Sequence, residues 1–240
     1  MTHLHVPDGI LPVWLWVSGM VLMAALLAVA LYRLRGMDRR RNVPLLGAVA
    51  AAMLVAMSLE ILPLAYHLNL SVAAGILLGP SLGFIAAFIV NLMLALMGHG
   101  GITVVGLNTI LLGTEAVIGH TLFFLLPARM PVFWRAAAAT VLALAVAAFL
   151  LIAIVGLSQV NVALLADEHG HGTADVPALT GPGSLRTFAL IVLSLGSIGW
   201  LIEGAVTGAV IRFIAQVKPD LLAHVLHREQ GTRDASRPTS

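Results

Sequence analysis

The 240-residue chain is 60% hydrophobic and only 10% charged, whereas ordinary soluble domains are about 45–50% apolar and about 25% charged. It contains no cysteine, which excludes disulfides, thiolate metal sites and cysteine nucleophiles. The formal net charge of +2 is too small for the phosphate contacts of a nucleic-acid-binding protein. The composition therefore predicts an α-helical protein that crosses the lipid bilayer several times and binds no nucleic acid.

Six stretches of the sequence are apolar over about the 20 residues that a membrane-spanning helix needs. A seventh, 68–78, is apolar but short, and it ends at Gly79-Pro80, a helix stop followed by a proline favoured in a first helical turn. Because so short a helix cannot span the bilayer alone, we expect its neighbours to shelter it. The six longer segments are 11–32, 44–64, 80–97, 104–126, 133–157 and 188–217.

The distribution of basic residues predicts the orientation of these segments. Five arginines lie within 33–41, directly after the first segment, and Lys218 opens a second basic region after the last. Basic residues accumulate on the cytoplasmic side, so seven crossings place the N-terminus outside, the C-terminus in the cytoplasm and the acidic stretch 159–184 outside. The sequence thus predicts an all-α membrane bundle of about seven helices as one domain, 1–227, and a polar tail, 228–240, expected to be disordered.

The N-terminal sequence MTHLHVPDGILP carries two histidines on the predicted outer face. When a histidine is second or third in a chain, the α-amine, a deprotonated backbone amide and the imidazole Nδ1 close fused chelate rings. Such a planar nitrogen set suits Ni(II), Cu(II) and Co(II). His3 and His5 are therefore candidate ligands, and the Pro7-Asp8-Gly9 sequence is typical of a tight turn that folds the terminus back. The alternative is an unstructured tail whose histidines have no role.

Other histidines on the predicted outer face lie beside membrane segments. His67, at the mouth of the second segment, is either a metal ligand or an interfacial cap. His99 lies in a glycine-rich loop ahead of Asn108 and Thr109, a pattern that favours a polar-lined cavity over a plain turn. We expect His99, Asn108 and Thr109, with Asp8, to support metal ligands through hydrogen bonds.

The loop 167–171, DEHGH, also carries metal-binding residue types. Flexible ligands lose ordering entropy when they bind an ion, so this loop is not expected to be the main site.

Four sequence blocks together resemble the CbiM/NikM family, the membrane-embedded substrate-capture component of energy-coupling-factor nickel/cobalt ABC transporters. The resemblance spans nearly the whole chain, with the blocks in the family's order. The blocks are HVPDG (5–9), HLN with GILLGP (67–69 and 75–80), HGGIT with Gly106, Asn108 and Thr109 (99–109), and EGAVTG with VKPDLL (203–208 and 217–222).

The resemblance implies a seven-helix unit that captures Ni(II) or Co(II) as cargo, with no permanent cofactor and no catalytic activity. It implies a square-planar nitrogen set made of the terminal amine, the second residue's amide and imidazole, and a further histidine matching His67. The implied partners are a transmembrane coupling protein, cytoplasmic ATPases and a small accessory membrane subunit in a prokaryotic cell membrane. The chain itself has no P-loop sequence for nucleotide binding. The resemblance does not distinguish nickel from cobalt.

The position of the N-terminal histidine departs from the family pattern, in which histidine is the second residue. Here His5 is fifth, and Leu4 stands where the family has its initiator methionine. Either translation begins at the Leu4 codon, which makes His5 second, or the printed start is correct and His3 takes the chelating role. The first explanation is slightly favoured.

Other readings of the membrane segments remain. Gly204 and Gly208 form a small-residue helix face suited either to docking of a partner or to packing inside the bundle. Glu115, Glu203 and His120 would serve as a relay in the alternative function, a proton- or ion-coupled secondary transporter. A zinc protease or serine hydrolase would need the His-Glu-x-x-His or Gly-x-Ser-x-Gly pattern, and neither is present.

Overall fold

The computed structural model describes seven helices and one pair of two-residue strands within residues 11–35, 37–58, 60–61, 66–98, 101–158 and 184–222. These elements confirm the predicted all-α class and its seven segments. The helices are α1 (Val13–Arg33), α2 (Arg39–Ser58), α3 (Ser71–Leu78), α4 (Pro80–Leu96), α5 (Val105–Leu125), α6 (Val132–Ser158) and α8 (Ser184–Val217), and the strands are β1 (Glu60–Ile61) and β2 (Tyr66–His67).

Five of the described helices are long and apolar enough to cross a membrane, namely α1, α2 from Arg40, α5, α6, and α8 from Leu185. The helix α4 is also apolar but shorter. The orientation of the termini stays a prediction from the charges, and the tail 228–240 lies outside the described residues.

The second segment begins earlier than the predicted range of 44–64, because α2 starts at Arg39. Asp38 explains this start: its Oδ1 accepts a hydrogen bond from the backbone N–H of Arg40 at 3.0 Å. A side-chain oxygen in this position satisfies one of the backbone N–H groups that lack a partner at a helix start. The helix therefore begins in the basic region, ahead of the apolar run that hydropathy detects.

The same segment also ends earlier than predicted, at Ser58. Beyond it β1 and β2 pair antiparallel, with Glu60 opposite His67 and Ile61 opposite Tyr66. Hydropathy cannot separate an apolar strand from an apolar helix, whereas Pro63, which removes a backbone donor and clashes inside a helix, is a sequence signal for the stop. This strand pair was not predicted, and it brings the chain back toward the bundle at His67.

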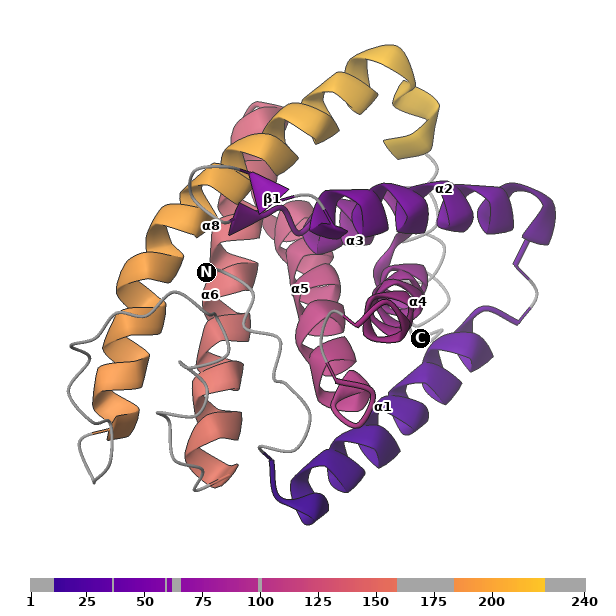
Figure 1. Cartoon of the computed structure of the whole chain (residues 1–240). Coiled ribbons are helices and arrows are strands. Elements are labelled where there is room, and N and C mark those ends of the chain that lie inside the picture. Colours follow the sequence, from indigo (N-terminus) through magenta and orange to yellow (C-terminus); the bar gives the residue numbers. More distant parts are fainter. Residues whose placement is uncertain are drawn as a thin grey trace, which may run out of the picture.

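The helix α5 forms the centre of the bundle. Within its most apolar 18-residue stretch, 67% is buried, against 22% for the corresponding stretches of α1, α2 and α8. Figure 1 shows α6 and α8 on one side of α5, and α1, α2 and α4 on the other. Most of the apolar stretch of α1, of α2 and of α8 is thus not covered by other helices of the bundle.

The short helix α3 lies directly against α5, and all eight of its residues are buried. A Cβ atom added at Gly75 would lie 2.0 Å from the carbonyl oxygen of Ala116 on α5, and one added at Gly83 on α4 would lie 3.0 Å from Gly75 Cα. Glycine therefore allows three backbones to approach closely. The expectation that neighbours shelter this short helix is confirmed.

The glycine face of α8 packs against α6. A Cβ atom added at Gly204 would lie 3.1 Å from the carbonyl oxygen of Ala137, and one added at Gly208 would lie 2.8 Å from that of Phe133. Packing inside the bundle thus accounts for both glycines. A partner that docks on this face would have to displace α6, so we do not retain partner docking as their role.

Candidate metal centre

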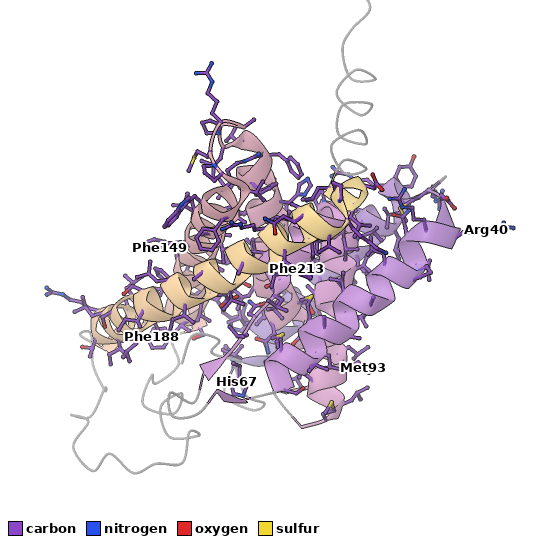
Figure 2. All side chains as sticks on the ribbon, turned by 90° about the horizontal axis from the view of Figure 1, so that it is seen from above. Arg40, His67, Met93, Phe149, Phe188 and Phe213 are labelled. Carbon is purple, nitrogen blue, oxygen red and sulfur yellow. The ribbon has the colours of Figure 1, made fainter. Side chains whose placement is uncertain are left out.

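His67 ends the strand β2, and its side chain is half-buried. The strand pair places it opposite Glu60, soon after α2 ends. In Figure 2 the label of His67 lies beside the strands, and that of Arg40 lies at the far, N-terminal end of α2. The candidate ligand and the basic start of α2 therefore lie at opposite ends of this helix.

The segment that follows His67 is anchored by Asn69, which is fully buried. Its Oδ1 accepts a hydrogen bond from the Ser71 backbone N–H at 2.8 Å, an Asx-turn that holds the chain at the first residue of α3. Its Nδ2 donates to Glu115 Oε2 on α5. The turn explains why α3 begins at Ser71 and not at 68, where the apolar run starts.

Glu115 is 4% exposed although it carries a carboxyl group in a membrane helix. Besides the bond from Asn69, its Oε2 accepts one from Ser71 Oγ at 2.6 Å. From the sequence, Glu115 was predicted as a member of a possible relay, with no link to Asn69 or Ser71. The sequence did carry one signal for these contacts. A carboxyl group inside a membrane segment has a high energy unless it is hydrogen-bonded, so Glu115 had to have polar partners.

A second tie between α5 and α3 lies further along. His120 is 1% exposed, and its Nδ1 lies 2.9 Å from the carbonyl oxygen of Gly75. Its ring also packs against Phe124, with centroids 4.6 Å apart. Glu115 and His120 on α5 thus both form hydrogen bonds to residues 69–75, at and just before α3. These bonds account for the two buried polar side chains without a proton relay.

Asn108 and Thr109 lie in the first turns of α5, where α4 approaches. Asn91 on α4 donates from Nδ2 to the carbonyl oxygen of Val105 at 2.9 Å and to Thr109 Oγ1 at 3.0 Å. Thr109 therefore helps to join α4 to α5, a contact that sequence analysis missed. Asn108 is 3% exposed, and its Oδ1 has no hydrogen-bond partner among the residues that the structure describes. It lies seven residues before Glu115, or about 10 Å along the helix axis.

The remaining predicted site residues, His3, His5, Asp8 and His99, lie outside the described residues, and their roles stay predictions. Within the described part of the chain, no three His, Cys, Asp or Glu side chains gather as a metal site. Of the three predicted ligands, His67 is the one whose surroundings the structure describes.

Curated relatives match the chain over most of its length. A "Putative fused nickel transport protein NikMN" of Archaeoglobus fulgidus is 28% identical over 91% of this chain and 68% of its own length. A "Putative metal transport protein" of Haloquadratum walsbyi is 31% identical over 91% of this chain and 93% of its own.

Two solved structures share the fold. A crystal structure of a transition metal transporter superposes with a TM-score of 0.71 at 19% identity, over 89% of this chain and 93% of that chain. A truncated transition metal transporter gives 0.70 at 20% identity, over 88% and 98%. The family model for the cobalt uptake substrate-specific transmembrane region matches residues 5–221. The predicted resemblance is thereby confirmed, and this multi-pass membrane protein belongs to the CbiM family, that of the cobalt uptake substrate-specific transmembrane region.

Proposed function

We propose that this chain is the substrate-capture component of an energy-coupling-factor ABC transporter in a prokaryotic cell membrane. It binds Ni(II) or Co(II) at the outer face and delivers the ion for uptake. The observation that supports this most directly is the setting of His67, half-buried between the strand pair and the Asn69 anchor. An imidazole that the fold holds at a fixed place supplies one nitrogen of a metal site already in position.

The N-terminal histidine supplies the other ligands in this proposal. The terminal amine, a backbone amide and the imidazole of His5, or of His3 if the printed start is the true one, form three corners of a planar nitrogen set, and His67 fills the fourth. Planar nitrogen sites suit Ni(II) and discriminate against tetrahedral Zn(II). The amine, amide and imidazoles must lose protons to bind, so affinity falls as the pH is lowered.

Buried polar groups near the start of α5 support the ligands in this proposal. Asn108 Oδ1 is a buried acceptor for which the described part of the chain supplies no hydrogen-bond donor. Such an acceptor suits the ring N–H of a metal-bound imidazole, which points away from the metal. Thr109, His99 and Asp8 are proposed to hold the same region by hydrogen bonds. A carboxylate or amide in this position fixes the tautomer of the ligand.

Transport energy comes from partner proteins in this proposal, because the sequence has no P-loop. We assign ATP hydrolysis to cytoplasmic ATPase subunits and the reorientation of the bundle to a transmembrane coupling protein, with a small accessory membrane subunit. This chain performs no catalytic step. In the competing reading, Glu115, Glu203 and His120 would couple metal movement to protons, and the chain would then transport without partners.

Metal titration and vesicle transport separate these two readings. The purified chain is expected to bind one Ni(II) or Co(II) ion by isothermal titration calorimetry, more weakly as the pH is lowered. Reconstituted alone into vesicles with a pH gradient, it is expected not to accumulate the metal. Uphill uptake by the chain alone would support the secondary transporter, and absence of binding to either metal would contradict both.

Mass determination of the purified chain's N-terminus belongs to the same experiment, because it assigns the chelating histidine. A start at position 4 assigns His5, and the printed start assigns His3. Tight binding that survives replacement of both histidines would contradict the N-terminal chelate.

A further inference from the structure

We infer that Glu115 is a positioning residue for His67: its carboxyl group, acting through Asn69 and Ser71, fixes the direction from which the imidazole reaches the metal. The inference rests on the proposed function, because it treats His67 as a ligand. Glu115 itself does not touch the metal. It lies on α5, and the residues it bonds follow His67 in the chain.

The carboxyl group of Glu115 needs hydrogen-bond donors because it is buried. Glu115 is 4% exposed in a membrane helix, where a carboxyl group without hydrogen bonds is strongly unfavourable. Its Oε2 accepts from both Asn69 Nδ2 and Ser71 Oγ. Two donors that meet on one oxygen hold the two residues in a fixed relation to α5, and an apolar side chain in place of Glu115 would hold neither.

The same carboxyl group is linked to the main chain beside His67. Asn69, two residues after His67, uses its amide nitrogen for Glu115 and its amide oxygen for the Ser71 backbone N–H at 2.8 Å. On the other side, the strand pair sets His67 opposite Glu60. The backbone of His67 is therefore held before and after the residue.

The helix α3, which follows Asn69, is itself held firmly against α5. The helix α3 is wholly buried, touches α5 at Gly75, and is bonded to it again through His120 Nδ1 and the Gly75 carbonyl oxygen. The anchor thus connects His67 to the most buried part of the bundle. Binding groups held in the bound geometry lose less entropy when the ligand arrives, so affinity rises without a new metal contact.

The inference is tested by nickel affinity in paired variants. Glu115→Ala is expected to weaken Ni(II) binding by about 10–100-fold, the range typical when a group that orients a metal ligand is removed. Glu115→Gln is expected to bind nearly as the wild type does, because its amide oxygen can accept both bonds. Thr140→Ala is the matched control: Thr140 is fully buried, but its Oγ1 bonds only its own helix, at Ala136 O, 2.8 Å away.

A double-mutant cycle separates positioning from general destabilisation. In a His67→Ala background, Glu115→Ala is expected to cause no further loss of the residual nickel affinity, because the ligand on which it acts is gone. An equal loss in both backgrounds would show that Glu115 acts on the fold in general and would overturn the inference. So would an unchanged nickel affinity in Glu115→Ala alone.

A spin label makes the inference testable without any metal. The chain has no cysteine, so His67→Cys gives one labelling site, and the electron paramagnetic resonance spectrum of a nitroxide there reports its mobility. Glu115→Ala is expected to raise that mobility, whereas Glu115→Gln and Thr140→Ala are expected to leave it unchanged. Failure of the wild type to bind nickel or cobalt would defeat the proposed function, whereas an unchanged label mobility in Glu115→Ala would defeat the positioning role.

Discussion

Replacement of His67 by alanine is expected to abolish tight nickel and cobalt binding while the bundle stays folded. The side chain is half-buried at the end of a two-residue strand, and alanine keeps the backbone pairing with Glu60. Removal of a group that only supports a metal ligand typically lowers metal affinity by about 10–100-fold. Removal of the ligand itself should have a larger effect, so we expect the affinity to fall by more than about 100-fold. Calorimetric titration measures the affinity, and helix content by circular dichroism measures the fold.

The matched control is His171→Ala, which removes an imidazole from the acidic loop and leaves His67 in place. This variant is expected to bind nickel as the wild type does, because the loop 167–171 supplies none of the ligands of the proposed site. If His67→Ala retains tight binding, His67 is not a ligand. If His171→Ala loses tight binding instead, the metal site belongs to the loop 167–171 and the arrangement proposed around His67 is wrong.

The helical segments were predictable because their signals are local. Hydropathy over a window of about 20 residues finds membrane helices without any knowledge of packing, and Gly79-Pro80 marks the boundary between α3 and α4 in the sequence itself. Hydropathy misplaced the two ends of α2, because other interactions determine where this helix begins and ends. The start of α2 depends on the side chain of Asp38, and its end depends on a strand pair whose first strand, Glu60–Ile61, lies inside the apolar run predicted as helix.

The polar contacts of the site were less predictable, because they join residues that only packing brings together. Glu115 lies 46 residues from Asn69 and 44 from Ser71, and Asn91 lies 18 from Thr109. A sequence shows that a buried polar group must have partners but not which ones. The sequence alone suggested His67 as a candidate ligand, because an imidazole beside a membrane segment is unusual, and that role stays a prediction.

Replacement of Gly75 by alanine is expected to be the most destabilising small substitution in the bundle. The added Cβ would lie 2.0 Å from the Ala116 carbonyl oxygen and 2.9 Å from its Cα, both backbone atoms that no rotamer change can move. Overpacking of a core costs about 1–3 kcal/mol when side chains can adjust, so we expect at least about 3 kcal/mol here. The readout is the thermal unfolding midpoint in detergent, or failure to recover folded protein.

The same substitution is expected to weaken nickel binding in whatever folded protein is recovered. To admit a Cβ atom at Gly75, α3 must move away from α5, and Asn69 and Ser71, which precede and begin α3, then draw back from Glu115. Stability and affinity should therefore fall together. In Glu115→Ala, by contrast, affinity is expected to fall more than stability, because the α3–α5 contact at Gly75 remains.

Gly47→Ala separates this steric effect from the general effect of replacing a helical glycine. Gly47 lies within α2, and a Cβ atom there would meet nothing within 4 Å, so the change should be neutral or stabilising by up to about 1 kcal/mol, the helix-propensity difference between glycine and alanine. An unfolding midpoint for Gly75→Ala equal to that of Gly47→Ala would contradict the close approach of α3 to α5. It would also remove the rigid support on which the positioning of His67 depends.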